Sequence, residues 1–178
     1  MRCCFVTKQK RAAQLSVAKP EITFAPEVKY PIGGSEIITV SGKVREKVYE
    51  ILYDEDNDHL CLSTMLLDAI TKVDIHLRNK LAENILLIGG TVMVPGFKAR
   101  LKEELHKQLK HDRYKKLKIS SFKFHTPPCK ENYTAWLGGA IYGATELLSM
   151  KALTREKYFK ENRLPDWPNM RDNFRTNN

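Results

Sequence analysis

One stretch near the middle of the chain constrains the fold more than any other: Asn84-Ile-Leu-Leu-Ile-Gly-Gly-Thr-Val-Met-Val-Pro-Gly-Phe97. Four consecutive apolar residues followed by two glycines are typical of a strand that is buried on both faces, as in a parallel sheet covered by helices. Beyond Pro95 and Gly96, apolar residues recur at every fourth position, namely Phe97, Leu101, Leu105 and Leu109. That spacing predicts an amphipathic helix, so the stretch reads as a strand, a turn and a helix of an α/β protein.

Similar short elements are predicted on both sides of this stretch. Strands are predicted at residues 36–40, after a turn at Gly33-Gly34, and at residues 118–124. Helices are predicted to contain residues 44–52, 66–73, 77–81, 136–148 and 155–160, with Ser63, Asp74 and Thr154 as N-caps. A polar and basic stretch through Lys19 and a proline-rich segment around Pro20 and Pro26 open the chain, and no helix is predicted there.

Charge is concentrated in one part of this 178-residue chain, which has a formal net charge of +9. Residues 98–118 contain nine basic and three acidic residues, so this stretch carries 9 − 3 = +6. Such a patch can attract nucleic acid, an anionic membrane or an acidic partner. Because Tyr114 is the only aromatic residue within it, the pattern favours the solvated face of a helix and its following loop over a nucleic-acid reader.

The residues that most often carry chemistry form no motif here. The five histidines and four cysteines show no metal-ligand spacing, and neither a nucleophile motif nor a Walker-type phosphate loop is found. The cysteines are interpreted as structural thiols in a reducing compartment, the cytosol or the nucleus. No apolar run approaches the roughly 20 residues of a membrane helix. Two glycine pairs, Gly89-Gly90 and Gly138-Gly139, are places where a backbone can approach a nucleotide, although packing alone explains many such pairs.

Three separated segments resemble the actins and actin-related proteins. They are residues 84–101, which resemble the adenosine-side motif of that family, Thr126-Pro-Pro with the later Ala135-Trp-Leu-Gly-Gly-Ala-Ile-Tyr-Gly-Ala, and the closing Leu153-Thr-Arg-Glu-Lys-Tyr-Phe. The similarity runs in unbroken order from about residue 1 to about residue 162. It implies an α/β, actin-like fold of the ribonuclease H-like ATPase type, of which this chain would supply only the C-terminal half, as a mixed sheet with flanking helices.

The resemblance also implies a division of the chain. Residues 1–57 would complete actin-like subdomain 4, and residues 58–132 would form subdomain 3 with the adenosine motif. Residues 133–178 would supply the C-terminal helices of subdomain 1 and a polar tail.

Candidate ligand contacts follow from the same resemblance. The residues implied to line the adenosine pocket are Gly89, Gly90, Thr91 and Met93, and no catalytic or metal-binding residue is implied. Val94 stands where actins commonly carry an aromatic residue. The two phosphate-binding hairpins of the family lie outside the matching half. ATP or ADP is therefore expected in a full-length protein, and neither nucleotide nor ATP hydrolysis is expected in this chain.

Within the family, residues 122–128, residues 135–144 and Leu164-Pro-Asp-Trp resemble the actin-related subunit at the pointed end of the dynactin filament. This implies a non-enzymatic cytoplasmic and cytoskeletal protein that caps the filament and serves dynein-driven transport along microtubules. Its partners would be the actin-related filament and other pointed-end subunits, with no nucleic acid or membrane partner. Actin-type filaments grow by head-to-tail contacts that do not close, so a member with one altered contact face stops growth.

Two other functions stay open at this point. A nuclear actin-related subunit of a chromatin-remodelling complex would fit the positive charge. An ATP-hydrolysing actin-like enzyme is disfavoured, because the implied phosphate-binding hairpins lie outside the matching half.

Overall fold

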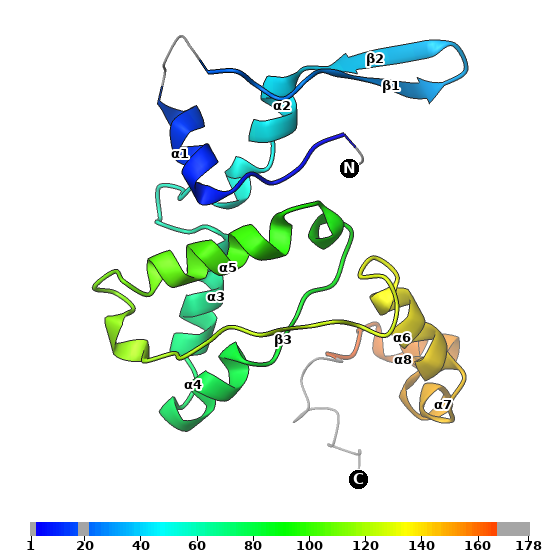
Figure 1. Ribbon diagram of the computed structural model, residues 1–178. Helices are drawn as coiled ribbons and strands as arrows, with labels where there is room; N and C mark the ends of the chain where they lie inside the picture. The colour runs from blue at the N-terminus through cyan, green and yellow to red at the C-terminus, as the bar shows by residue number, and fades with distance from the viewer. Residues whose placement is uncertain (1–2, 18–21, 167–178) are drawn as a thin grey trace. The chain divides into compact units, whose positions relative to one another are not determined.

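The computed structural model describes residues 3–17 and 22–166, and the chain divides into two compact units between Ala135 and Trp136 (Figure 1). The α-helices of the first unit are α1 (Gln9–Ser16), α2 (Gly42–Lys47), α3 (Leu62–Thr71), α4 (Ile75–Ala82) and α5 (Phe97–Gln108). Single 3₁₀ turns occur at η1 (Glu50–Leu52), η2 (Thr91–Met93) and η3 (Lys115–Leu117). The three-part subdomain division expected from the resemblance stays a prediction.

Strands β1 (Val28–Gly33) and β2 (Glu36–Val40) form an antiparallel hairpin in which Tyr30 lies opposite Ile38. The predicted strand at residues 36–40 and the turn at Gly33-Gly34 are confirmed. The large apolar side chains of the hairpin are exposed, namely Tyr30, Ile32, Ile37 and Ile38. Pro20 and the segment from Trp167 onward lie outside the described residues.

Strands β3 (Ile85–Leu86) and β4 (Phe124–His125) form a parallel pair, with Ile85 opposite Phe124. Both are shorter than the predicted strands at residues 85–88 and 118–124. The prediction that the apolar run is buried on both faces is wrong: Leu86 is 53% and Ile88 is 47% exposed, whereas Ile85 and Leu87 are half-buried. Side chains alternate between the faces of a strand, and in the described part of the chain only one face of β3 packs against the core.

Helix α5 organises the core of the first unit. The predicted apolar stripe is confirmed, because Phe97, Leu101 and Leu105 are at most 4% exposed and Leu109 is half-buried. Helix α5 packs against α3, whose Leu67 and Ile70 enter the same core. At roughly 1.5–3 kcal/mol for each fully buried large apolar side chain, this stripe is the main apolar support of the unit.

Two helix starts differ from the sequence predictions. Helix α3 begins at Leu62 rather than after Ser63, because the Thr64 hydroxyl accepts a hydrogen bond from the Cys61 backbone N–H at 2.8 Å and closes the first turn from there. Helix α1 was not expected in its basic stretch. Only Leu15 of this helix is buried, so no apolar period marks it in the sequence.

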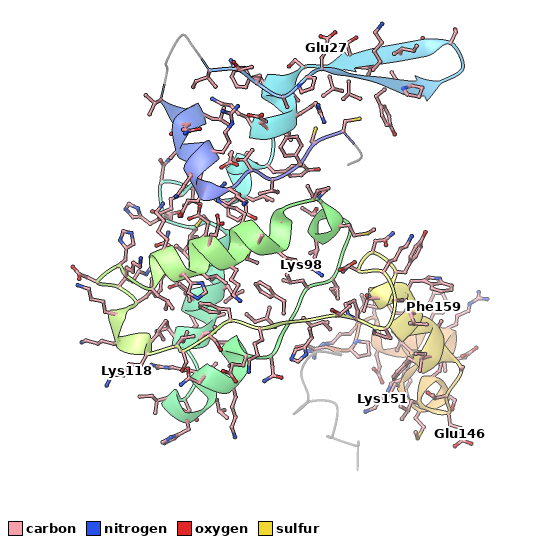
Figure 2. The ribbon with its side chains drawn as sticks, in the orientation of Figure 1. Glu27, Lys98, Lys118, Glu146, Lys151 and Phe159 are labelled. Carbon is pink, nitrogen blue, oxygen red and sulfur yellow. The ribbon has the colours of Figure 1, made fainter. Side chains whose placement is uncertain are left out.

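The second unit contains most of α6 (Thr134–Gly143), together with α7 (Leu147–Lys151) and α8 (Arg155–Glu161). A continuous helix over residues 136–148 was predicted, but it breaks after Gly143. Thr154 is confirmed as an N-cap, since its hydroxyl accepts from the Lys157 N–H at 3.2 Å. None of the described residues in these three helices is buried, and Phe159, labelled in Figure 2, is 69% exposed.

Three further expectations, on the helical glycines, on membrane helices and on the cysteines, can be compared with the described residues. A Cβ at Gly138, Gly139 or Gly143 would meet nothing within 4 Å, so the close approach that three helical glycines suggest is not found in this part of the chain. In the ranges 3–17 and 22–166, no helix has the length and apolar character needed to cross a membrane. The four cysteines carry free thiols, and only Cys61 is buried.

Candidate functional site

The four residues implied to contact adenosine form one turn between β3 and α5. Gly89 has a φ of +105°, a conformation that side-chain-bearing residues rarely adopt, and its N–H donates to the Glu131 carbonyl oxygen at 2.8 Å. The carbonyl oxygen of Gly90 accepts from the Met93 N–H at 3.2 Å, which closes η2. Thr91 and Met93 are exposed on this turn. Their assignment as nucleotide contacts stays a prediction.

A shallow hollow of about 440 Å³ lies beside this turn. Its lining includes Met93, Val94, Phe97, Lys98 and Glu131, whereas Gly89, Gly90 and Thr91 are not among its lining residues. The Lys98 ammonium, labelled in Figure 2 near the start of α5, donates to Glu131 Oε1 at 2.6 Å. That hydrogen bond is the main cause of the lowered pKa of the Glu131 carboxyl. Val94 is only 3% exposed, so its side chain belongs to the core rather than to a surface that could stack on a base.

The residues of the turn leave room for one wall of a nucleoside site, and that role stays a prediction. The space beside Gly89 is open, because a Cβ there would meet nothing within 4 Å, and Thr91 presents a hydroxyl on the surface. They do not fit a phosphate site: the Gly89 N–H is already bonded, and Lys98, the nearest cation lining the hollow, is paired with Glu131. Among the described residues, no group of three or more His, Cys, Asp or Glu side chains could hold a metal ion.

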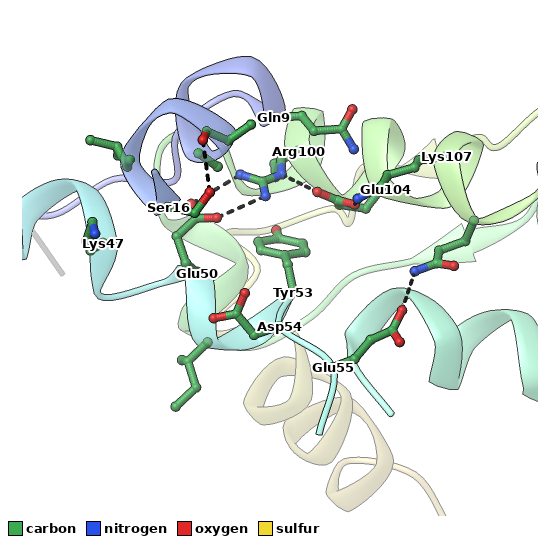
Figure 3. Close-up of a pocket in the computed structure, with 15 residues that line it drawn as sticks. Gln9, Ser16, Lys47, Glu50, Tyr53, Asp54, Glu55, Arg100, Glu104 and Lys107 are labelled. Carbon is green, nitrogen blue, oxygen red and sulfur yellow. Dashed lines mark hydrogen bonds and ion pairs between the residues drawn. The ribbon is translucent and has the colours of Figure 1, made fainter. Parts of the chain in front are cut away.

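A buried ion-pair cluster around Arg100 was missed by the sequence predictions. Its guanidinium donates to both carboxylate oxygens of Glu50, at 3.1 and 2.9 Å, and to Glu104 Oε1 at 2.7 Å (Figure 3). It also donates to the Thr7 carbonyl oxygen at 2.9 Å and lies 4.8 Å from the centre of the Tyr53 ring. The cluster thus joins α5 to the N-terminal segment and to η1.

Arg100 is largely buried together with two carboxylates, so the three side chains carry 1 − 2 = −1. The Arg100 side chain is 5% exposed, and its carboxylate partners Glu50 and Glu104 are 16% and 6% exposed. Burial by itself would lower the pKa of Arg100, but the hydrogen bonds to the two carboxylates outweigh it and raise that pKa. Burial also raises the pKa of the Tyr53 hydroxyl. A hollow of about 580 Å³ next to the cluster, shown in Figure 3, is lined by charges of both signs that largely pair with one another.

The interpretation of residues 98–118 as a solvated basic face holds for seven of the nine basic residues, which are exposed, and is wrong for Arg100. Arg100 is buried, and so is its partner Glu104. Five of the nine basic residues are in ion pairs: Lys98, Arg100, Lys107, Arg113 and Lys115. The available signal was position, because residues 100 and 104 each directly precede a core leucine and lie at the edge of the apolar stripe.

Comparisons with known proteins extend over most of the chain. The family model described as Actin matches residues 1–163. The chain is similar to Actin-related protein 10 of Dictyostelium discoideum, with 30% identity over 93% of this chain and 40% of that protein. Putative actin-29 of the same organism is 27% identical over 75% of this chain and 34% of its own length. Actin-like protein 9 of Homo sapiens is 25% identical over 87% of this chain and 35% of its own length.

The chain thus spans 34–40% of the length of the curated relatives it matches. The family match covers the hairpin, the strand–turn–helix stretch and the closing helices in one continuous range. This confirms the predicted actin-like α/β fold class, as a partial fold with small sheets and flanking helices. The chain belongs to the actin family.

Proposed function

We propose that this chain is part of an actin-related subunit that caps the pointed end of the dynactin filament and links it to other pointed-end subunits, in support of dynein-driven transport. The observation that carries the proposal is the similarity to Actin-related protein 10, which is higher than that to the actin-named and actin-like relatives above, at 30% against 27% and 25%. The segments at residues 122–128 and 135–144 support the same assignment, because they resemble the pointed-end subunit of dynactin.

The exposed apolar side chains are consistent with a role that depends on protein contacts. Trp136, Met150 and Phe159 are each more than 60% exposed, and the hairpin carries four further exposed apolar side chains. Large exposed apolar patches mark surfaces that other polypeptide covers. The proposed partners are therefore proteins, in a cytoplasmic, cytoskeletal assembly.

The proposed role is not enzymatic. The turn at residues 89–93 offers one wall of a nucleoside site and no group positioned for phosphate. We expect the full-length protein to bind ATP or ADP through this wall together with the phosphate-binding hairpins of the family, and the nucleotide to hold the two lobes together rather than to be turned over.

The chromatin-remodelling alternative depended on the positive charge of residues 98–118. That charge is less available than the sequence suggests, since five of the nine basic residues are ion-paired within the chain. Tyr114, the one Phe, Tyr or Trp residue of the stretch, is 2% exposed and cannot stack on a base without leaving the core.

Affinity isolation tests the proposal. The full-length protein, tagged and expressed near its native level, is isolated from cells and its bound proteins are identified by mass spectrometry. We expect the actin-related filament subunit and the other pointed-end subunits of dynactin to be recovered. Recovery of chromatin-remodelling subunits in their place, or nuclear retention of the tagged protein, would contradict the proposal. Turnover of ATP by the isolated chain above the buffer rate would contradict the non-enzymatic part.

A further inference from the structure

A basic row that is separate from the Arg100 cluster runs along the outward face of α5 and ends at Lys110, in the turn that follows the helix. Lys102, His106 and Lys110 follow one another at intervals of four residues, and all three are exposed. Residues at this spacing lie on one face of a helix, about 6 Å apart along its axis. They line a hollow of about 570 Å³, here called the α5 basic hollow, together with Gln9, Glu103 and Lys107.

The charge of the α5 basic hollow is not balanced by its own residues. Three lysines and one glutamate line it, which gives 3 − 1 = +2 without His106. Glu103 is engaged as well, because its carboxylate accepts the Gln9 backbone N–H at 3.0 Å. Lys107 is also 3.8 Å from Glu104, so Lys102 and Lys110 are the lysines on which the argument rests. By contrast, the hollow beside Arg100 contains acids and bases that already pair.

Two polar groups of the hollow differ in their contacts: the His106 ring is held in place, and the Gln9 side-chain nitrogen has no hydrogen-bond partner among the described residues. The His106 ring packs edge-on against the buried Phe122, with ring centres 5.4 Å apart, and its Nδ1 lies 2.7 Å from the Lys102 carbonyl oxygen. A carbonyl oxygen only accepts, so Nδ1 carries the hydrogen, and Nε2 of the neutral ring is an acceptor that does not itself bind a carboxylate. The Nε2 of Gln9 is buried without a hydrogen-bond partner among the described residues. A donor in that position favours a ligand that brings oxygen acceptors.

From this geometry we infer that the α5 basic hollow binds an acidic, extended segment of a partner protein. Alternate residues of a β-strand point to the same side and lie about 6.6–6.8 Å apart, which matches the interval of about 6 Å along the helix. A segment with a carboxylate at every second position would therefore place carboxylates beside both Lys102 and Lys110. Nucleic acid fits less well, because Tyr114 is buried and residues 98–118 contain no other Phe, Tyr or Trp for stacking.

This inference deepens the proposed function by giving the chemistry of one docking segment, and it depends on that proposal only in taking the partner to be a protein. Its test uses the purified 178-residue chain and synthetic probes. The first probe is a fluorescein-labelled peptide with alternating glutamate and serine, and the second has the same composition with its glutamates contiguous. A labelled DNA duplex of about 20 base pairs is the third. Binding is measured by fluorescence anisotropy at about 50 mM and about 200 mM salt.

The test variant combines Lys102→Gln with Lys110→Gln. The matched control combines Lys116→Gln with Lys118→Gln. It removes the same charge, but from exposed lysines that do not line the hollow. We expect the alternating peptide to bind more tightly than its isomer. We expect the double variant at Lys102 and Lys110 to raise the Kd of the alternating peptide about fivefold, and the control variant to raise it less than twofold. Equal losses for the two pairs, no preference between the peptides, no binding at the lower salt, or tighter binding of DNA would each overturn the inference. None of these outcomes bears on recovery of dynactin subunits, so the two proposals fail separately.

Discussion

Replacement of Arg100 by methionine removes the centre of the buried ion-pair cluster while keeping most of the side-chain volume. The guanidinium makes four hydrogen bonds, two to Glu50, one to Glu104 and one to the Thr7 carbonyl oxygen, and its side chain is 5% exposed. Without it, two carboxylates of 16% and 6% exposure remain in one place with no cation between them. Breaking a buried pair in this way costs about 3–5 kcal/mol, and the partial exposure of Glu50 favours the lower end.

A loss of about 3 kcal/mol is large beside the roughly 5–15 kcal/mol by which a domain of this size is stable. The assay is urea denaturation followed by far-ultraviolet circular dichroism, with hydrogen exchange measured by mass spectrometry to locate the loss. Because Arg100 joins α5 to residue 7 and to η1, exchange should rise first in α1 and η1 and later in α3.

Arg113→Met is the matched control. Arg113 pairs with Asp68 at 2.6 Å and lies over the Tyr114 ring, but half of its side chain is exposed, so the expected loss is about 1 kcal/mol or less. A triple variant, Arg100→Met with Glu50→Gln and Glu104→Met, removes the stranded charges and should recover at least half of the loss. Equal losses for the two arginine variants, or a triple variant no more stable than Arg100→Met alone, would refute the reasoning.

Three further predictions concern the backbone, the pH dependence and the second unit. In the same urea assay, Gly96→Ala should lower the free energy of unfolding more than Gly89→Ala does. Both glycines have a positive φ, and an alanine in that conformation costs about 1–3 kcal/mol. Only at Gly96 would the new Cβ also clash, because it would lie 2.2 Å from the Val6 carbonyl oxygen. Burial raises the pKa of Tyr53 above its ordinary value of about 10. The contribution of Tyr53 to stability is therefore complete below pH 10, and the free energy of unfolding falls by about 1.4 kcal/mol per pH unit above pH 10. Tyr53→Phe should make the free energy of unfolding fall less steeply at alkaline pH, and an unchanged steepness would count against the burial of Tyr53. Thr154→Ala should reduce protection of the first turn of α8 by about 1 kcal/mol in hydrogen exchange, while Thr154→Ser keeps it.

The apolar stripe of α5 was predictable because its period is local. Phe97, Leu101 and Leu105 are each within one turn of the next, and a helix is the only regular structure that brings residues four apart onto one side. Of the hairpin, only strand β2 was predicted, because it is short, rich in β-branched residues and preceded by glycines. Strand β1 was harder to predict because it contains Pro31, and proline is rare inside sheets. Proline is tolerated there because each strand of a two-stranded sheet has a free edge.

Burial was not predictable where it depends on distant sequence. Arg100 and Glu50 are separated by 50 positions, so neither residue shows locally that the other will neutralise it. For the run Ile85-Leu-Leu-Ile88, the sequence predicted more burial than the structure has. Four consecutive apolar residues indicate a strand buried on both faces only if other parts of the chain cover both faces. In the described residues one face is covered, and Leu86 and Ile88 are exposed. For the adenosine-side turn, the sequence predicted an open, glycine-based backbone, but the bond that commits the Gly89 N–H to Glu131 crosses 42 positions and could not be foreseen.

Helix α5 explains how one short segment can hold a core and still present a charged face. Its 12 residues carry three rows, each repeating every four positions: Phe97 with the core leucines, Arg100 with Glu104, and Lys102 with His106, a row that Lys110 continues just past the helix end. Because 3.6 residues make a turn, rows that start at different residues point in different directions around the axis. A substitution in one row therefore leaves the others in place. This is why the 102/110 pair should alter peptide binding without loss of stability, whereas Arg100→Met should do the reverse. A 102/110 variant as unstable as Arg100→Met would mean that the basic row belongs to the core and is not a docking surface.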